Sequence, residues 1–407
     1  MPSAALGIIL RQPPTGLRTL TLSNVITDAT RRANLQGDGL AEPGGFGVWP
    51  AATNIVTQSI PGALATTGVT KAGDAAATLT KVTDATAPFQ ASSADVWLLD
   101  NSAGATDATV DFDGNATAAA YTGSVWAKKI AGSPTVSIEG GGTPTAISGT
   151  ASYARYTQSL TANLNDNLRI TAPAGAVVRF TAGQLETGPI ANPFIVTNGG
   201  TASRSAGRAT VPVQGLFTTT QGAVFTRLRT GHESTAAYPS ADAESYVWSW
   251  RDDNSNRIGL TYQSPASSFW ECLRIAAGAG ASLTAADTFV EGDGISTLMA
   301  WTAAALFFGL DGAAQTTVAN TAIPALAATV VEIGLFASGF GMCADNIRWL
   351  LTMKGTPTDA DNALMHSWGD IVPTLEQIRQ LSPGSKPTLL IPAKTADAVL
   401  LPAYFGG

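Results

Sequence analysis

The chain has 407 residues, of which 45% are hydrophobic, 13% charged and 7% aromatic, and it contains 42 Gly and 22 Pro. A charged fraction about half the globular average of about 25% excludes a solvated disordered chain, and the length predicts two to three domains. The 23 basic and 30 acidic residues give a net charge of −7, and no basic run exceeds a pair, which argues against nucleic acid as a partner.

The N-terminal segment, residues 1–39, is predicted to be an arm that attaches the chain to partners. Its apolar stretch, Ala4 to Leu10, has no basic residue before it and is too short for a signal-peptide core, so we expect no secretion by that route. Two apolar runs further along, Leu298 to Leu310 and Ala322 to Phe340, are too short or too interrupted to span a bilayer. They predict buried core and no membrane insertion.

Short segments rich in Val, Ile, Thr and aromatic residues, bounded by Gly, Pro, Asn or Asp, dominate residues 40–198 and 199–370. This pattern predicts antiparallel strands and two tandem β-sandwiches, an all-β fold of jelly-roll type. The predicted strands are Thr109–Phe112, Tyr121–Ile130, Thr135–Glu139, Tyr153–Leu160, Asn167–Thr171, Ala176–Thr181, Ala223–Arg229, Tyr246–Trp250, Arg257–Tyr262, Phe269–Ile275, Leu306–Leu310, Thr316–Ala319, Val330–Phe336 and Asn346–Met353.

Turn and linker signals separate these strands. Asp113-Gly114 and Asp311-Gly312 each predict a hairpin, because Gly accepts the positive φ of a tight turn. The stretch from Gly188 to Arg204 contains two prolines and a Gly pair without periodicity. It predicts a domain boundary near Asn198.

The end of the second sandwich and the segment after it change character. Thr356 or Thr358 begins a predicted helix that ends at Trp368, because a threonine cap, Pro357 and two aspartates suit a helix N-terminus. A second short helix is predicted from Thr374 to Leu381. Residues 371–407 therefore form a short helix and an apolar tail, which we expect to dock on another surface.

Catalytic constellations are scarce. The two histidines, His232 and His366, lie 134 positions apart, and no HExxH, GxSxG, GxxxxGK[ST] or GxGxxG motif occurs. The nearest match to a paired-carboxylate glycosidase strand, Glu291-Gly-Asp293, lacks the second Glu. Cys272 and Cys343 have no metal-ligand spacing, and we interpret them as buried small side chains. The sequence predicts a non-enzymatic protein.

Two candidate ligand sites remain. Asp252, Asp253 and Asn254 form an oxygen cluster between two strands that could hold a structural Ca²⁺, although turn chemistry explains the same residues. Nine tryptophans exceed the seven tyrosines, and alternation places Tyr246, Trp248 and Trp250 on one sheet face. These three and Trp126 form a sugar-stacking platform if exposed, or ordinary core if buried. The carbohydrate-binding candidates are therefore Tyr246, Trp248, Trp250 and Trp126.

Residues 40–204 resemble a carbohydrate-binding-module-like jelly roll that recurs in virion proteins of tailed phages and prophages. The segments that carry this resemblance are Trp49–Ser59, Tyr121–Lys128, Tyr153–Thr157, Ala182–Gly188, Pro193–Thr197 and Ala202–Arg204. Residues 205–370 are similar to the laminin-G/concanavalin-A-like sandwich. That similarity is carried by Gly222–Phe225, Asn256–Ile258, Phe308–Gly312, Glu332–Leu335, Ile347–Leu351 and Thr358–Asp361.

The resemblance implies a surface protein of a tailed phage or phage-like particle, a head fibre or spike or a tail fibre. Such a lectin-like protein is made in the bacterial cytoplasm, assembles with other virion proteins as a homo-oligomer, for which a trimer is our guess, and attaches to host cell-surface polysaccharide. Two alternatives stay open, a purely architectural protein without ligand and a polysaccharide depolymerase. Exposed tryptophans would favour sugar binding, and buried tryptophans would favour architecture.

Overall fold

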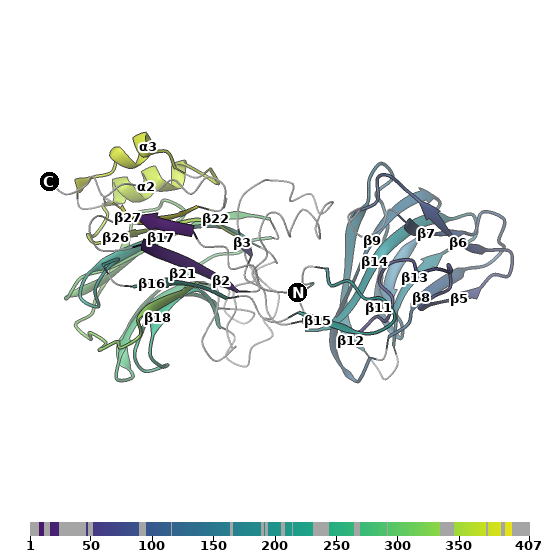
Figure 1. Ribbon diagram of the computed structural model, residues 1–407, viewed down its shortest axis with the longest axis horizontal. Coiled ribbons are helices and arrows are strands. Elements are labelled where there is room, and N and C mark those ends of the chain that lie inside the picture. The colour runs from purple at the N-terminus through teal and green to yellow at the C-terminus, as the bar shows by residue number, and fades with distance from the viewer. Residues whose placement is uncertain are drawn as a thin grey trace. The chain divides into compact units, whose positions relative to one another are not determined.

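The sequence forms antiparallel strands in the computed structural model (Figure 1), which describes residues 8–11, 17–23, 46–47, 52–88, 95–114, 116–162, 166–188, 191, 194–204, 208–213, 215–230, 244–263, 269–290, 292–333, 346–371, 373–383 and 387–392. The chain divides into two units. Unit 1 comprises Met1–Asp28, Pro43–Pro50 and Ala206–Gly407, and unit 2 comprises Ala29–Glu42 and Ala51–Ser205. Each unit is a β-sandwich, so the predicted all-β fold class is confirmed.

Unit 2 contains two five-stranded sheets and a two-stranded ribbon. In spatial order, the first sheet consists of β11 (Gly141–Ala146), β10 (Thr135–Ile138), β13 (Leu168–Ala172), β8 (Ala108–Phe112) and β5 (Val69–Gly73). The second consists of β12 (Ala154–Ala162), β9 (Ala119–Ala131), β14 (Val177–Thr187), β7 (Asp95–Asp100) and β6 (Thr78–Thr83). The ribbon pairs β15 (Ala202–Arg204) with β4 (Ala52–Asn54).

The core of unit 2 lies between these two sheets. Trp97 of β7, Phe112 of β8 and Phe180 of β14 are fully buried, and the centroids of their rings are 5.3–5.7 Å apart. A second cluster, containing Trp126 and Phe194, lies on the other face of the β9 sheet. Both faces of that sheet are therefore covered by apolar side chains, and an aromatic residue on either face is buried.

Unit 1 contains an eight-stranded and a seven-stranded sheet. The first consists of β1 (Ile8–Arg11), β2 (Leu17–Ser23), β16 (Arg208–Pro212), β25 (Val330–Ile333), β18 (Glu244–Arg251), β19 (Arg257–Gln263), β20 (Phe269–Ala276) and β21 (Ala279–Ala286). The second consists of β24 (Thr316–Ala319), β23 (Ala305–Leu310), β22 (Gly294–Trp301), β17 (Gly222–Arg229), β26 (Asn346–Met353) and β27 (Pro387–Pro392), with β3 (Phe46–Gly47) also paired to β26.

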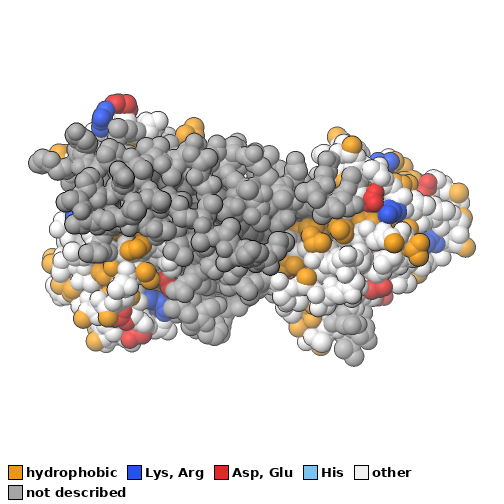
Figure 2. All heavy atoms as spheres, viewed as in Figure 1, with side chains coloured by type: hydrophobic (Ala, Val, Ile, Leu, Met, Phe, Trp, Pro, Cys, Tyr) orange, Lys and Arg blue, Asp and Glu red, His pale blue; other side chains and the backbone are white. Residues whose placement is uncertain are grey.

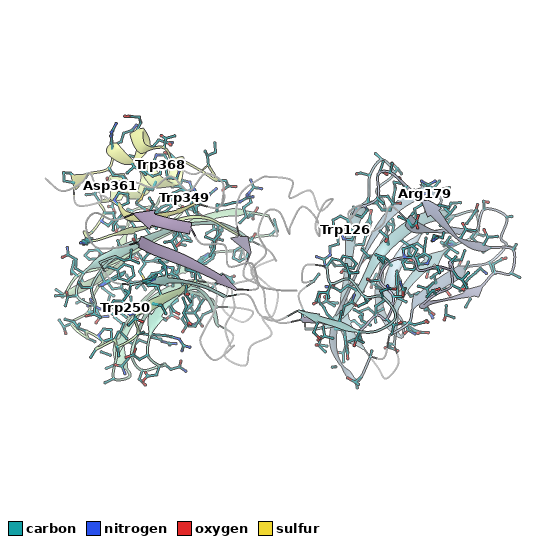
Figure 3. The ribbon with its side chains drawn as sticks, viewed as in Figure 1. Trp126, Arg179, Trp250, Trp349, Asp361 and Trp368 are labelled. Carbon is teal, nitrogen blue, oxygen red and sulfur yellow. The ribbon has the colours of Figure 1, made fainter. Side chains whose placement is uncertain are left out.

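Two helices make a third layer on the seven-stranded sheet of unit 1 (Figure 1). They are α2 (Asp359–Ser367) and α3 (Leu375–Arg379), and each begins with a capping box, at Thr358 and Thr374 respectively. Both predicted helices are confirmed, with Thr358 rather than Thr356 as the cap. Trp368 packs against Trp349 of β26 (Figure 3), with ring centroids 6.0 Å apart. The other face of this sheet meets the eight-stranded sheet, where Trp301 packs on Trp248.

The N-terminal segment differs from the predicted arm, and the described part of the C-terminal tail docks within the chain. Within residues 1–39, β2 pairs with β16 and β1 pairs with β2, so these strands extend the eight-stranded sheet. Alternating polar and apolar residues from Thr19 to Ser23 carry this strand signal. In the C-terminal tail, β27 pairs with β26, so this part docks on its own sheet. Residues 393–407 lie outside the described residues.

The two predicted hairpins have opposite outcomes. The Asp311-Gly312 hairpin is confirmed, because β23 and β24 pair and both turn residues have positive φ, 47° and 74°. The Asp113-Gly114 hairpin is wrong, because β8 pairs with β13 and β5 while β9 belongs to the other sheet. Asp113 instead joins the two sheets, and its carbonyl accepts a hydrogen bond from the Thr57 amide at 2.9 Å.

Candidate functional site

The predicted sugar platform is buried. Tyr246, Trp248, Trp250 and Trp126 are at most 6% exposed, so as surface stacking residues they are a wrong prediction. Trp248 and Trp250 contact Phe217, with centroids 6.4 and 5.5 Å from its ring, inside unit 1. Trp126 lies in unit 2 (Figure 3). Every tryptophan of the described residues is buried, and Trp49 lies outside them.

A β-bulge also breaks the predicted alternation in β18. Tyr246 lies opposite Thr261, and Trp248 lies opposite Leu260, so the register shifts by one residue between them. Because Leu260 and Thr261 are consecutive residues of β19, they point to opposite faces, and so do Tyr246 and Trp248. Trp248 and Trp250 share the core face, whereas Tyr246 accepts a hydrogen bond from Arg257 on the other face.

The proposed calcium loop is held by protein donors. Both carboxylate oxygens of Asp252 accept backbone amides, from Ala327 at 2.8 Å and Ala328 at 2.7 Å. Asp253 accepts the amides of Ser255 and Asn256 within its own turn, at 2.7 and 2.8 Å. The Asn254 oxygen accepts from Arg251 at 3.3 Å. Asp253 and Asn254 therefore bond within their own turn, whereas Asp252 ties the loop to Ala327 and Ala328, and the arrangement does not fit a calcium site.

The most buried charged network described in unit 2 is centred on Asp84. Its carboxylate accepts hydrogen bonds from Lys128 at 3.0 Å, Arg179 at 2.7 Å and the Tyr153 hydroxyl at 3.0 Å, and from the amide and hydroxyl of Thr86. Lys128 also lies 4.8 Å from the centroid of the Tyr153 ring. The carboxylate is thus fully engaged by groups of its own unit.

The groups around Asp84 favour its ionised form. Burial raises the pKa of its carboxyl, but hydrogen bonds from Thr86, Arg179 and Lys128 outweigh burial and hold the pKa well below its ordinary value. Burial and the neighbouring Asp84 charge raise the pKa of Tyr153 far above its ordinary value, so its hydroxyl stays a donor. We interpret this network as structural.

A serine, a histidine and an aspartate meet on the helix-covered face of unit 1, but their geometry is not that of a catalytic triad. Ser296 Oγ lies 2.8 Å from His366 Nδ1, and Asp311 Oδ1 lies 3.4 Å from Ser296 Oγ and 4.0 Å from the same Nδ1. In a triad the imidazole bridges serine and carboxylate through its two different nitrogens. Here both partners lie at one nitrogen, so the set provides no relay.

The candidate binding site is a group of arginines around one carboxylate, here called the Asp370 cluster and defined as Arg227, Arg229, Arg348 and Asp370. Alternation along β17 places Arg227 and Arg229 on the same face as Phe225, under the helices. Asp370 follows α2. Arg227 Nε donates to its Oδ1 at 2.7 Å, Arg229 Nε donates to its Oδ2, and Arg348 Nε of β26 lies 4.0 Å from Oδ2.

Backbone features hold the Asp370 cluster in place. Gly369 adopts a φ of 61°, which a helix C-terminus commonly assigns to glycine, and its carbonyl accepts a hydrogen bond from Trp349 Nε1 at 3.0 Å. Gly294 lies beneath Arg227, and a Cβ at this position would come within 2.5 Å of Arg227 Nη2. The loop and the missing side chain together position two guanidinium groups against one carboxylate.

Positive charge exceeds negative charge within the cluster. Burial raises the pKa of Asp370, but hydrogen bonds from Arg229 and Arg227 outweigh it and lower the pKa below its ordinary value. Arg227 Nη1 is buried without a hydrogen-bond partner among the described residues. The Arg229 side chain keeps 28% of its surface exposed, so the cluster is accessible from solvent at this arginine.

Within the described ranges, no group of three or more His, Cys, Asp or Glu side chains is arranged to hold a metal ion. No described helix is both long and apolar enough to cross a membrane. On the face shown in Figure 2, charged side chains are few and scattered among uncharged ones, so the Asp370 cluster is a local concentration of charge in a sparsely charged chain.

Comparisons with known proteins identify no family. No family model and no curated protein match the chain. Among solved structures, a heptameric SAP-like pentraxin from Limulus polyphemus is similar at 13% identity with a TM-score of 0.28, over 36% of this chain and 69% of the pentraxin. A candidate carbohydrate-binding protein from Bacteroides ovatus is similar at 9% identity and 0.28, over 70% of this chain and 84% of its own. Similarity at this level assigns no function.

Proposed function

We propose that the chain is a non-enzymatic adhesion protein, carried on the surface of a tailed phage or phage-like particle, that binds host polysaccharide. The single observation that carries the binding function is the Asp370 cluster, where guanidinium groups on strand β17 are held by Asp370 and are open to solvent at Arg229. Guanidinium groups present several N–H donors in a fixed fork, which suits oxygen-rich ligands. The resemblance of residues 40–204 to a jelly roll that recurs in virion proteins supports the location.

A glycan array probed with the purified full chain tests the binding function. We expect binding to a subset of bacterial surface polysaccharides, with no release of reducing ends when the bound polymer is incubated with the protein. Reducing-end release would establish a depolymerase instead. Absence of binding to every glycan on the array would overturn the adhesion function.

The second candidate function is a purely architectural role without a ligand. It is favoured by the burial of every described tryptophan, because sugar rings commonly stack on exposed aromatic faces. An architectural protein would bind no glycan yet would assemble with other virion proteins. Incubating the purified chain with particles that lack it, and measuring its uptake by sedimentation, separates assembly from adhesion.

The location and oligomeric order are part of the same proposal. We expect the protein to form a homo-oligomer, a trimer, and we expect antibodies against it to label intact particles. Light scattering coupled to size exclusion gives the oligomeric mass, and immunogold labelling of purified particles gives the location. A monomer that is absent from particles would contradict this part of the proposal.

A further inference from the structure

We infer that the Asp370 cluster binds an acidic sugar, one that carries a carboxylate or a sulfate or phosphate ester, rather than a neutral sugar. This inference rests on the proposed polysaccharide-binding function and deepens it by naming the chemical class of ligand. It starts from the ratio of charges, since two arginines share a single carboxylate through their Nε atoms.

The hydrogen-bonding pattern leaves donors for a second anion. Arg227 and Arg229 each donate a hydrogen bond from Nε to Asp370. A guanidinium group has five N–H donors, so the Nη groups of Arg229 stay available on its exposed side. A carboxylate or sulfate accepts two such donors side by side, which is the preferred geometry of arginine recognition.

The surroundings of Arg227 favour a second negative charge. Arg227 is largely buried, and its Nη1 has no hydrogen-bond partner in the described part of the chain. A buried cation that is not fully compensated raises the electrostatic potential at its neighbour. An anion placed on Arg229 would offset this potential, whereas a neutral hydroxyl would offset it far less.

The Asp370 cluster is accessible to solvent at Arg229. Arg229 and Asp370 keep 28% and 15% of their side-chain surfaces exposed, and the next residue, Ile371, is 76% exposed. In the Asp84 network the carboxylate is 6% exposed and accepts hydrogen bonds from four side chains of its own unit. An exposed apolar side chain beside the cluster also offers contact to the ring carbons of a sugar.

The test compares wild-type protein with Arg229→Gln and a matched control on a glycan array that holds uronate-containing, sulfated and neutral polysaccharides. The control, Lys354→Gln, removes the same charge from an exposed side chain just after the other end of β26. We expect wild type and the control to bind acidic glycans equally, and Arg229→Gln to bind them at least about tenfold more weakly. Arg229→Lys should fall between, because it keeps the charge and loses the fork.

Two further measurements keep the result interpretable. Thermal unfolding of each variant verifies that Arg229→Gln is folded, and affinity for the best acidic glycan should fall between about 0.05 M and about 0.5 M salt, as screening requires. Inorganic phosphate and sulfate are titrated in parallel. Competition by either ion at low concentration would assign the site to a free anion, and would overturn the sugar as its ligand.

The outcomes separate this inference from the proposed function. Glycan binding that is confined to neutral polymers, or that Arg229→Gln leaves unchanged, overturns the acidic-sugar site and leaves adhesion intact. Loss of all glycan binding in wild type overturns adhesion, and the acidic-sugar site with it. Selective loss of acidic-glycan binding in a folded Arg229→Gln protein, with the control unaffected, supports both.

Discussion

Each unit of the chain places one aspartate between two cations, yet the two networks differ in how they are completed. In unit 2, the hydroxyl groups of Thr86 and Tyr153 donate to Asp84, and the Tyr153 ring lies against Lys128, one of its two cationic partners. In unit 1, Asp370 has arginines on both oxygens and a third guanidinium at 4.0 Å. Both networks place two cations on one carboxylate, and each contains a partly exposed arginine, Arg179 at 33% and Arg229 at 28%. They differ at the carboxylate, because Asp84 is 6% exposed and also binds two hydroxyl groups, whereas Asp370 is 15% exposed and accepts hydrogen bonds from arginines alone among the described residues. The more open carboxylate and the third guanidinium favour a ligand at Asp370.

The largest expected effect is at the closed network. Asp84→Asn should lower the free energy of unfolding by about 3–5 kcal/mol, because it leaves Lys128 buried without its counterion. Chemical denaturation of the full chain measures the loss. Asp95→Asn, which removes the partially exposed Lys81–Asp95 pair of the same sheet, is the control and should cost at most about 1 kcal/mol. Equal effects of the two variants would mean that Asp84 is not a buried counterion.

The pH dependence of stability should follow from the same residue. The pKa of Asp84 is lower in the folded chain than the ordinary value of 3.8, so its ionised form contributes stability that is complete above about pH 5 and is lost as pH falls through the folded pKa. The difference in unfolding free energy between wild type and Asp84→Asn should therefore shrink on acidification below about pH 4. A difference that stays constant down to pH 2 would contradict the assignment.

Asp370→Asn should have a smaller effect of the same sign, about 1–3 kcal/mol. The substitution leaves Arg227 and Arg229 adjacent without a negative charge, but Arg229 can turn toward water because part of its side chain is exposed. Denaturation measures the loss, and Glu376→Gln, which breaks the exposed Glu376–Arg379 pair, serves as the control. If Asp370→Asn cost more than Asp84→Asn, unit 1 would hold the more enclosed network.

Much of this fold is predictable from sequence, because strands and caps are local patterns. Every predicted strand overlaps a strand of the structure, and the threonine caps begin the helices as expected. Pairing is not local, and the Asp113-Gly114 hairpin fails since β8 and β9 belong to different sheets. The N-terminal arm fails for the same reason, because β2 finds its partner, β16, far along the chain.

The candidate site was beyond local patterns. Arg227 and Arg229 contact Asp370 across separations of 143 and 141 residues, and the only local signals are an Arg-x-Arg step in a strand and a Gly-Asp pair after a helix. The tryptophans were wrongly predicted as surface residues because alternation shows which residues share a face of a sheet, but not whether another layer covers that face. Sheets in both units have a further layer outside the sandwich core, and that layer buries rings on the outer face as well.

Removing the N-cap of α2, the helix that precedes Asp370, tests how much this helix contributes to the stability of unit 1. Thr358→Ala should cost about 1 kcal/mol, because the Asp361 amide loses the Thr358 hydroxyl. Thr356→Ala, which removes the hydroxyl of the alternative cap, should cost less than about 0.5 kcal/mol. Denaturation of both variants ranks the two threonines, and an equal cost would contradict the observed cap. Among the described residues, the groups that bind Asp84 lie on strands, turns and loops, so the same cap test has no counterpart there.

The smallest change in stability, and the sharpest test of the comparison, comes from Gly294→Ala. The new Cβ would lie 2.5 Å from Arg227 Nη2 and 3.5 Å from Asp370 Oδ1. Since the nearest atom is the end of a flexible side chain, the guanidinium should shift at a cost of less than about 1 kcal/mol. Gly200→Ala, whose Cβ meets nothing within 4 Å, is the control.

Gly294→Ala should nevertheless change affinity for acidic glycans several-fold, because a displaced Arg227 would shift Asp370 and, with it, the Arg229 guanidinium that binds the ligand. Glycan titration and thermal unfolding of the same preparations measure binding and stability together. If Gly294→Ala binds acidic glycans as wild type does, the position of Arg227 is irrelevant to the ligand. The Asp370 cluster would then be a structural network of the same kind as that of Asp84, and the difference between the two units would lie only in their solvent exposure.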